Sequence, residues 1–433
     1  MYKQQQTALD LLQLWITSDK QLFVLLCYSG TGKSYLCKML LEWYRENYSN
    51  NSVAVLAPSH KAVKNIQQIL TGLVEATTIS SFLGLTPKID EKTGVMSFGV
   101  NSDRNCTASP SDFDLVIVDE FSMINKETVM DLNNQCKKIL YLGDPAQLPP
   151  IGEDTSIVPT LSATKYQLTD VVRYSGDLAK VAHSWRKDVP VECGSGMTVT
   201  LKRISAPIPI TTTADETIIE LSKARWIIKY CDSIADGSNV QLLTFTNKAC
   251  DKWNSFVRSE IWGNSEPFMI GDKLIAKSPL FRPSGTKNRL QTAFNNSTEF
   301  TVIGDYRLNS LRLLNNNYEY YSLSVNSESN QTTDLFILTP SGKLAQQVEL
   351  ERLKNEAIAS KINSHRGALW GQWHQLKKTF DDVDFAYAIT THKAQGSTYD
   401  AVYLDLPDLC KCRDTERITY TALTRSKQAY TYI

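Results

Sequence analysis

The chain has 433 residues, a length that suits two to four domains. Its apolar fraction of 42% and charged fraction of 21% are those of an ordinary globular protein and exclude a disordered chain. Lys and Arg number 46, as do Asp and Glu, so the net charge is zero. This balance excludes a protein that coats nucleic acid through its total charge, although it leaves room for a local basic channel.

Cysteine spacing and hydropathy further restrict the class of protein. The nine Cys are scattered, and Cys410 and Cys412 have no partner pair at zinc spacing, so we expect neither a disulfide framework nor structural zinc. No run of 18 apolar residues is present, and the first residues, MYKQQQTALDLL, lack an apolar signal core. We therefore expect a soluble protein of a reducing cytoplasm, with no membrane contact.

The first part of the chain alternates apolar strands with helices. An amphipathic helix is predicted over 1–20, because Leu9, Leu12 and Ile16 share one face. A buried strand, a Gly-rich loop and a helix over 33–46 follow. Buried strands are predicted at 21–26, 53–56, 115–118 and 139–142. This alternation predicts a parallel sheet covered on both faces.

A polar segment over 84–113 interrupts this pattern. It contains Gly94, Gly99 and several Ser and Asn residues, and it predicts an insertion in the form of a β-hairpin. The tripeptide MSF places Phe98 near the tip of that hairpin.

After Arg173 a second α/β unit begins, with its clearest strand at 240–245. Residues 270–340 are β-rich, and strands are predicted at 300–303, 318–323 and 335–338. A charged helical stretch over 344–362 follows, and the α/β pattern returns with strands at 385–389 and 401–404. The β-rich part is therefore predicted to be an insertion into the second α/β domain.

The sequence CYSGTGKS at 27–34 lies between a predicted strand and a predicted helix. It fits G-x-x-x-x-G-K-[ST], the loop whose backbone N–H groups face phosphate oxygens, except that Cys27 replaces the first glycine. Lys33 would reach the β- and γ-phosphates of ATP, and the Ser34 hydroxyl would hold Mg²⁺. The phosphate-binding residues predicted by this loop are Ser29, Gly30, Thr31, Gly32, Lys33 and Ser34.

Asp119 and Glu120 follow the apolar strand LVIV. In a P-loop fold an Asp at the end of such a strand holds Mg²⁺, directly or through water. The adjacent Glu can orient the attacking water as a general base. The strand and the upstream phosphate loop together favour this site over a solvated acidic pair.

Further motifs resemble those of superfamily 1 helicases. They are LAPSHKA at 56–62, DEFSM at 119–123, GDPAQLPP at 143–150, LTDVVRYS at 168–175, LLTFTNKACDKWN at 242–254, TTHKAQGST at 390–398 and YTALTRSK at 420–427. The T-H-K-A-Q-G and A-L-T-R versions are typical of the RecD/Dda-like, 5′→3′ branch. The segment FNNSTEFTVI at 294–303 is similar to part of that group's second-domain insertion.

This resemblance implies an α/β fold of two RecA-like P-loop domains. The first would carry the β-hairpin insertion, and the second a β-rich, SH3-like insertion followed by helices. The implied boundaries are 1–173 for the first domain, with 84–113 as its wedge, then 174–270, 271–384 for the insertion, and 385–433 for the closing part. The helical stretch 344–380, with Trp370 and Trp373, would brace the hairpin.

The resemblance also implies roles around the nucleotide. Gln147 would sense the γ-phosphate, and Gly396 would approach it through the backbone. Arg173 and Arg425 would stabilise charge in the transition state, the arginine-finger role. Gln5 would read adenine, although Gln4 and Gln6 leave the register of that match open.

The single-stranded DNA track is implied in the same way. Hydroxyl, amide and imidazole groups at family positions would contact phosphate and sugar, and they are Ser59, His60, Thr78, Ser81, Thr246, Asn247, Thr391 and His392. Phe82, Trp253 and His392 would stack on bases or else pack in the core. Phe98 would stack under the first base pair of the duplex, or pack against its own hairpin.

The function implied is an ATP-dependent 5′→3′ single-stranded DNA translocase and DNA helicase, with ATP and Mg²⁺ as cofactors. Its partners would be single-stranded DNA, fork duplex DNA, and a single-stranded-DNA-binding protein or replisome component. We expect a monomer in a bacterial or phage-infected host cytoplasm, serving DNA replication, recombination or repair. One alternative is a translocase that displaces proteins with little unwinding, and another is a nucleotide-gated binding protein. The complete catalytic set disfavours the latter, and the second α/β unit disfavours a P-loop kinase or small GTPase.

Overall fold

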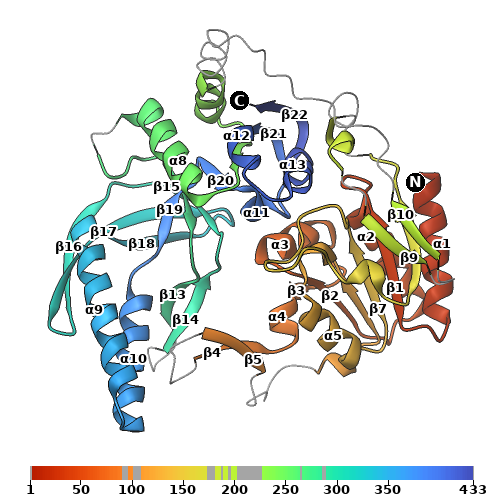
Figure 1. Ribbon diagram of the computed structural model, residues 1–433, viewed down its shortest axis with the longest axis horizontal. Coiled ribbons are helices and arrows are strands. Elements are labelled where there is room, and N and C mark those ends of the chain that lie inside the picture. The colour runs from red at the N-terminus through yellow and green to blue at the C-terminus, as the bar shows by residue number, and fades with distance from the viewer. Residues whose placement is uncertain are drawn as a thin grey trace. The chain divides into compact units, whose positions relative to one another are not determined.

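The computed structural model describes residues 2–89, 96–100, 109–172, 181–186, 189–193, 197–201, 227–263, 266–284 and 289–432. The chain divides into two compact units. The first unit comprises Met1–Leu85, Asn101–Lys252 and Ala388–Ile433, and the second comprises Thr86–Val100 and Trp253–Tyr387. Figure 1 shows the elements of both. No helix of the described residues has the length and apolar character needed to cross a membrane.

The first unit contains a six-stranded sheet with the order β3-β2-β6-β7-β1-β8, in which every pairing is parallel. Its strands, in chain order, are β1 (Leu22–Cys27), β2 (Val53–Ala57), β3 (Ala76–Thr78), β6 (Leu115–Val118), β7 (Ile139–Gly143) and β8 (Thr164–Leu168). The central strands are apolar throughout because both faces of the sheet are covered. The predicted strands are thereby confirmed, with bounds that differ by one residue at most.

Alternate residues of each strand enter two separate cores, as the period of two in a strand requires. Leu25 of β1 packs with α1 (Lys3–Thr17), α2 (Lys33–Asn47) and α3 (His60–Ile69). Leu26 packs on the other face with residues of α4 and α5. The shorter elements on this side are α4 (Ile79–Phe82), α5 (Lys126–Gln135) and the 3-10 turns Pro110–Asp112, Phe121–Met123 and Val158–Thr160.

A second parallel sheet in the same unit has the order β20-β11-β21-β22. Its strands are β11 (Val240–Thr244), β20 (Ala388–Thr390), β21 (Tyr399–Leu404) and β22 (Ser426–Tyr432). The helices that precede or follow these strands along the chain are α8 (Asn247–Trp262), α11 (Thr391–Ala394), α12 (Leu406–Leu409) and α13 (Thr415–Leu423). Further helical residues are found at 181–184 and 227–235. The prediction of two α/β motor sheets is confirmed.

The second unit is built on an antiparallel sheet with the order β16-β17-β15-β12-β19, and β18 pairs with β17. Its strands are β12 (Lys273–Ala276), β15 (Glu299–Val302), β16 (Arg307–Leu313), β17 (Asn316–Ser327), β18 (Thr332–Leu338) and β19 (Val383–Phe385). Three two-stranded sheets are also present among the described residues. They are β4 (Leu85–Ile89) with β5 (Met96–Val100), β9 (Val189–Cys193) with β10 (Met197–Leu201), and β13 (Leu280–Ser284) with β14 (Arg289–Phe294). β4 and β5 lie within the segment predicted as an insertion.

Two elements that were predicted as continuous are each divided into two in the structure. The strand predicted at 385–389 is two strands, because β19 pairs with β12 in the second unit while β20 pairs with β11 in the first. Between them Tyr387 is buried, and its hydroxyl lies 2.6 Å from Asp272 Oδ1. Residues 385–389, FAYAI, are an unbroken apolar run, so the sequence shows no break at this point.

The helical stretch predicted over 344–380 is likewise two helices, α9 (Pro340–Ala359) and α10 (Asn363–Thr379). Ser360 and Ile362 have extended backbones and separate the two helices. The Arg366 guanidinium donates to the Ser360 carbonyl oxygen at 2.8 Å and closes the turn. No Pro or Gly marks this break in the sequence.

Candidate nucleotide site and nucleic-acid track

The loop between β1 and α2 is shaped by two glycines in the left-handed region, Gly30 at φ 83° and Gly32 at φ 81°. Gly32 is the N-cap of α2, and a Cβ atom there would lie 2.5 Å from Gln5 Nε2. The left-handed conformation therefore requires glycine at this position, and a Cβ atom there would also displace the Gln5 side-chain amide. The first-turn N–H groups of a helix have no acceptor within the helix, so they are available to an anion such as phosphate.

Cys27, which replaces the first glycine of the motif, ends β1 as a buried core residue with 1% exposure. Its thiol lies 3.6 Å from the Leu25 carbonyl oxygen. Burial raises the pKa of the Cys27 thiol to about 12, which keeps it neutral. The loop therefore keeps its turn with a small, uncharged side chain in the place of glycine.

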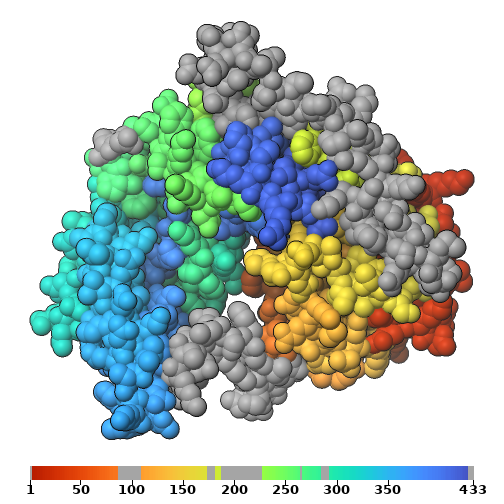
Figure 2. Space-filling view, in the orientation of Figure 1, coloured from red at the N-terminus to blue at the C-terminus, as the bar shows by residue number. Residues whose placement is uncertain are grey.

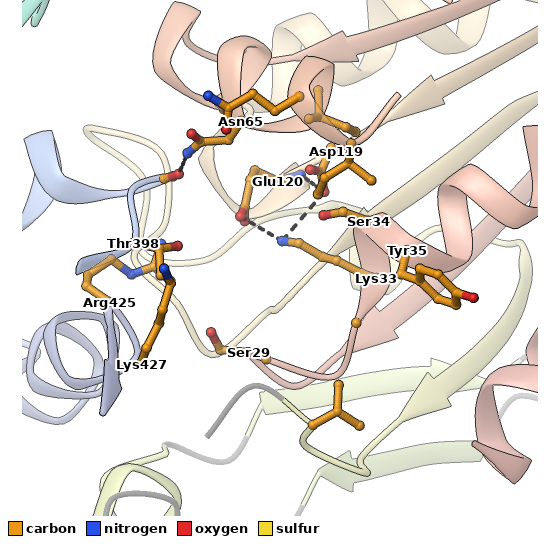
Figure 3. Close-up of a pocket in the computed structure, with 18 residues that line it drawn as sticks. Ser29, Lys33, Ser34, Tyr35, Asn65, Asp119, Glu120, Thr398, Arg425 and Lys427 are labelled. Atoms are coloured by element: carbon orange, nitrogen blue, oxygen red, sulfur yellow. Dashed lines mark hydrogen bonds and ion pairs between the residues drawn. The ribbon is translucent and has the colours of Figure 1, made fainter. Parts of the chain in front are cut away.

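The acidic pair and the loop lysine meet inside the first unit. Lys33 Nζ lies 2.6 Å from Glu120 Oε1 and 3.5 Å from Asp119 Oδ1, as the dashed lines of Figure 3 show. Burial raises the pKa of Asp119, although the ammonium opposes that shift. Burial lowers the pKa of Lys33, but the two carboxylates outweigh it, and the pKa stands above its ordinary value. The lysine therefore carries a full charge at the position predicted for phosphate.

Glu120 has a left-handed backbone, with φ 54° and ψ 46°. A residue other than glycine in this conformation is strained, and such strain concentrates at functional sites. The Glu120 side chain points toward Lys33 of the loop, and the Asp119 carboxylate accepts the Glu120 N–H at 2.9 Å.

Residues from both parallel sheets line one cavity of about 480 Å³, a volume suited to a nucleotide. From the first sheet they include Ser29, Gly30, Gly32, Lys33, Ser34, Asn65, Asp119 and Glu120. From the second they are Gly396, Thr398, Arg425 and Lys427. Figure 3 shows Arg425 and Lys427 across the cavity from Lys33.

Arg425 is 2% exposed and is held by its own sheet. Its guanidinium donates to the Thr421 carbonyl oxygen at 3.1 Å and to Thr424 Oγ1 at 3.2 Å. Gly396, at φ 83°, accepts a hydrogen bond from the Asn65 side chain through its carbonyl oxygen. The second sheet therefore contributes the buried Arg425 guanidinium and the backbone of Gly396 to the cavity lining.

Four predicted nucleotide residues lie outside the cavity lining or outside the described residues, namely Gln5, Thr31, Gln147 and Arg173. Gln147 is buried, with its Oε1 3.5 Å from Gln395 Nε2. Thr31 is buried and donates its hydroxyl to the Tyr28 carbonyl oxygen. Arg173 falls outside the described residues, but Val172 N–H, one residue earlier, donates to the Gly30 carbonyl oxygen at 2.9 Å.

Among the three successive glutamines, the structure gives each a different position. Gln5 is buried, and its Nε2 donates to the Thr31 carbonyl oxygen at 2.9 Å. Gln4 Oε1 accepts the Thr169 N–H at 2.9 Å, and Gln6 is exposed. Gln5 is therefore the one of the three that faces the phosphate loop.

The hydroxyls predicted to follow DNA are largely used to hold the backbone. Ser59 caps α3, and Thr78 caps α4 by accepting the Ser81 N–H. Thr246 donates to Asp408 at 3.0 Å, and the buried Thr391 donates to the Thr244 carbonyl oxygen at 3.0 Å. The exposed members of the predicted set are His60, Ser81 and Asn247.

The aromatic candidates differ in position. Phe82 is 9% exposed and packs in a core with its ring 5.4 Å from that of Phe113, so the core-packing alternative describes it. His392 is half-buried, and burial lowers its pKa, which favours the neutral ring. Trp253 is half-buried, with its ring 6.0 Å from that of Phe256. The side chain of Phe98 lies outside the described residues. The bracing of the hairpin by α10 therefore stays a prediction.

Sequence reasoning missed a buried cluster beside the cavity, made by Asp144, Arg186 and Tyr420. Asp144 and Tyr420 lie within motifs that were recognised, but neither was singled out. Arg186 lies in no motif, so no sequence signal pointed to it. Among the described residues, no group of three or more His, Cys, Asp or Glu is arranged to hold a metal ion.

Known protein families and relatives match most of this chain. The family described as AAA domain matches residues 1–198, and the UvrD-like helicase C-terminal domain matches residues 385–431. The ATP-dependent DNA helicase dda of enterobacteria phage T4 is 24% identical over 441 residues, which cover 94% of this chain and 92% of that protein. The uncharacterized protein R530 of Acanthamoeba polyphaga mimivirus is 24% identical over 493 residues, with 98% of each chain covered.

Solved structures agree at the level of the fold. The Pif1 helicase from Candida albicans has a TM-score of 0.50 at 16% identity, with 100% of this chain and 94% of that chain covered. A Pif1 chain from a study of unwinding at forked double-stranded DNA has a TM-score of 0.51 at 14% identity, with 100% and 91% covered.

The two parallel sheets, the phosphate loop and the matched families define a P-loop motor protein of helicase superfamily 1. Within that superfamily, the chain is similar in sequence to the Dda helicase of branch 1B, and its fold is similar to that of the Pif1 structures. The resemblance that the sequence motifs indicated is thereby confirmed.

Proposed function

We propose that this protein is an ATP-dependent DNA helicase that moves along single-stranded DNA and separates the duplex ahead of it. One observation carries the proposal, namely that Lys33 and Glu120 of the first sheet and Arg425 of the second line the same cavity. A triphosphate held by both sheets would couple its hydrolysis to a change in their separation. The T4 protein named above, which is described as an ATP-dependent DNA helicase, supports the same activity.

The chemistry follows from the residues of the cavity. The N–H groups at the start of α2 and the Lys33 ammonium would bind the β- and γ-phosphates. Phosphate would compete with Glu120 for Lys33, which releases the Glu120 carboxylate to accept a proton from the attacking water. The Arg425 guanidinium would stabilise charge on the γ-phosphate as the second sheet closes.

Mg²⁺ fits the donor set near the loop. Magnesium prefers hard oxygen ligands, and the Ser34 hydroxyl and an Asp119 carboxylate oxygen are oxygen donors in the lining of this cavity. When bound there, Mg²⁺ would neutralise charge on the β- and γ-phosphates.

Several finer assignments are part of the same proposal. We assign 5′→3′ polarity because it is typical of the branch. We assign single-stranded DNA to the exposed side chains of His60, Ser81 and Asn247, and we retain the wedge role of Phe98 and the predicted domain boundaries. The arginine-finger role of Arg173, the γ-phosphate role of Gln147 and the adenine role of Gln5 stay predictions, as do the monomeric state, the cytoplasmic location and a single-stranded-DNA-binding protein or replisome partner.

A strand-displacement assay tests this function with three substrates, a 5′-tailed, a 3′-tailed and a blunt duplex, each with and without ATP. We expect opening of the 5′-tailed duplex only, and only with ATP. Opening of the 3′-tailed duplex alone would reverse the polarity. DNA-stimulated ATP hydrolysis without opening of any duplex would favour the protein-displacing translocase, and hydrolysis that ignores added DNA would contradict the motor assignment.

A further inference from the structure

A single carboxylate, Asp144, joins both motor sheets to the phosphate loop. It follows β7 directly and is 1% exposed. Its Oδ2 accepts the Ser29 N–H at 2.9 Å and the Tyr420 hydroxyl at 2.6 Å. Its Oδ1 accepts the Ala146 N–H at 3.0 Å and an Arg186 N–H at 2.9 Å. All four donors are directed at one buried anion.

Two of these donors, the N–H groups of Ser29 and Ala146, lie in the first α/β domain next to predicted nucleotide residues. Ser29 lies in the phosphate loop, so its hydrogen bond fixes the first half of that loop. Ala146 precedes Gln147, whose N–H donates to the Asp144 carbonyl oxygen at 3.2 Å. Asp144 therefore sets the shape of the loop and of the turn that carries Gln147.

Tyr420 comes from the second sheet, on α13. Its neighbour Thr421 also contacts the turn, because Thr421 Oγ1 accepts the Leu148 N–H at 3.1 Å. The Thr421 carbonyl oxygen in turn holds Arg425. The helix that places the arginine of the second sheet is thus docked on the turn that shapes the phosphate loop. Figure 2 shows the blue C-terminal segment meeting the yellow segment of the first sheet.

Arg186 supplies the opposite charge. It is 3% exposed, and its guanidinium carbon lies 3.9 Å from the centroid of the Tyr28 ring, within cation–π distance. A buried carboxylate without a paired cation would be costly, and the Arg186 guanidinium, 2.9 Å from Asp144 Oδ1, supplies that cation. Tyr28 is itself a residue of the phosphate loop, so the cation is anchored on the loop that Asp144 holds.

We propose that Asp144 is a positioning residue that transmits closure of the second sheet to the phosphate loop, with Tyr420 as the contact made on closure and Arg186 as the fixed counter-charge. This inference rests on the proposed motor function and deepens it. Closure would place Arg425 at the cavity and, through the same helix, complete the hydrogen bonds that fix Ser29. The loop would then be set for catalysis only when the two sheets are together.

The test is Tyr420→Phe, which removes one hydroxyl and keeps the ring. Hydrogen bonds to charged groups are strong enough that we expect kcat of DNA-stimulated ATP hydrolysis to fall about 10- to 100-fold. KM for ATP should change less than about threefold, because Tyr420 does not line the cavity. The matched control is Tyr141→Phe, because the Tyr141 hydroxyl of β7 donates to Asn133 Oδ1 of α5, away from the cavity lining, so its loss should leave kcat unchanged.

A double-mutant cycle adds a second measurement. Asp144→Asn and Tyr420→Phe should be non-additive, so that the double variant is no slower than Asp144→Asn alone. Arg186→Lys keeps the charge but loses the planar contact with Tyr28, and it should recover more activity than Arg186→Gln. Thermal unfolding of each variant shows whether it is folded.

A loss in Tyr420→Phe no larger than in Tyr141→Phe would overturn the inference, and so would additive effects in the cycle. This failure is distinct from failure of the proposed function, because it would occur in a protein whose wild-type hydrolysis responds to DNA. If the wild type shows no DNA response, the motor assignment itself fails.

Discussion

Replacing Glu120 by Gln tests the assignment of the general base most directly. The amide has the same shape as the carboxylate, and its oxygen can still accept a hydrogen bond from Lys33 Nζ, which lies 2.6 Å from Glu120 Oε1. The left-handed backbone at this position is retained with a side chain of similar size. The substitution therefore removes the proton acceptor while it leaves the geometry of the loop in place.

The expected magnitude follows from this role. General base catalysis contributes about 10²- to 10⁴-fold to a rate, so kcat of DNA-stimulated hydrolysis should fall by that factor. ATP binding should persist, because Lys33 and the loop N–H groups remain. It should even tighten slightly, since one of the two carboxylates that compete with phosphate for Lys33 is lost.

Two measurements separate these effects. Single-turnover hydrolysis with saturating DNA gives the chemical rate, and equilibrium binding of a fluorescent ATP analogue gives the affinity. Glu127→Gln is the matched control, because Glu127 is exposed in the first turn of α5, outside the cavity lining. A rate within about threefold of the wild type would refute the base assignment, and a loss of affinity with an unchanged rate would make Glu120 a binding residue.

Three further outcomes are expected. Lys33→Ala should abolish DNA-stimulated ATP hydrolysis, whereas Lys38→Ala, at a partly exposed position of the same helix outside the cavity lining, should not. Full turnover in Lys33→Ala would remove Lys33 from the phosphate site. Phe98→Ala should lower the number of base pairs opened per ATP more than it lowers DNA-stimulated hydrolysis, and Phe98→Trp should restore it; an unchanged ratio would contradict the wedge role. At pH 8, iodoacetamide should label the exposed Cys410 and leave Cys27 unmodified in mass spectra, because a pKa of about 12 leaves about one Cys27 thiol in ten thousand ionised; rapid labelling of Cys27 would contradict its burial.

The sequence predicted those parts of the fold whose signals are local. The strands of the first sheet are continuous apolar runs because both faces are buried, and their periodicity is enough to find them. The phosphate loop and the acidic pair could also be predicted, because phosphate binding and hydrolysis need fixed residue types at fixed spacing. Lys33, Asp119, Glu120 and Arg425 do line one cavity.

The sequence could not show features that depend on distant partners. The change of sheet between β19 and β20 depends on which strand each one pairs with, and the run of apolar residues at 385–389 hides it. The choice among Gln4, Gln5 and Gln6 depends on how α1 is rotated against the loop. Arg186 has a role only because Asp144 and Tyr28 lie beside it, and no spacing in the sequence records that.

The adjacency of β11 and β20 has a consequence for how the protein is made. These strands are hydrogen-bonded neighbours, yet the chain between them includes Trp253–Tyr387 of the second unit. During synthesis β11 emerges long before its partner, so the sheet that carries Arg425 is completed last. Until then β11 presents an unpaired apolar edge, which is a site for aggregation or chaperone binding. A nascent chain released before residue 388 would hold the phosphate loop but lack the strands needed to finish the motor.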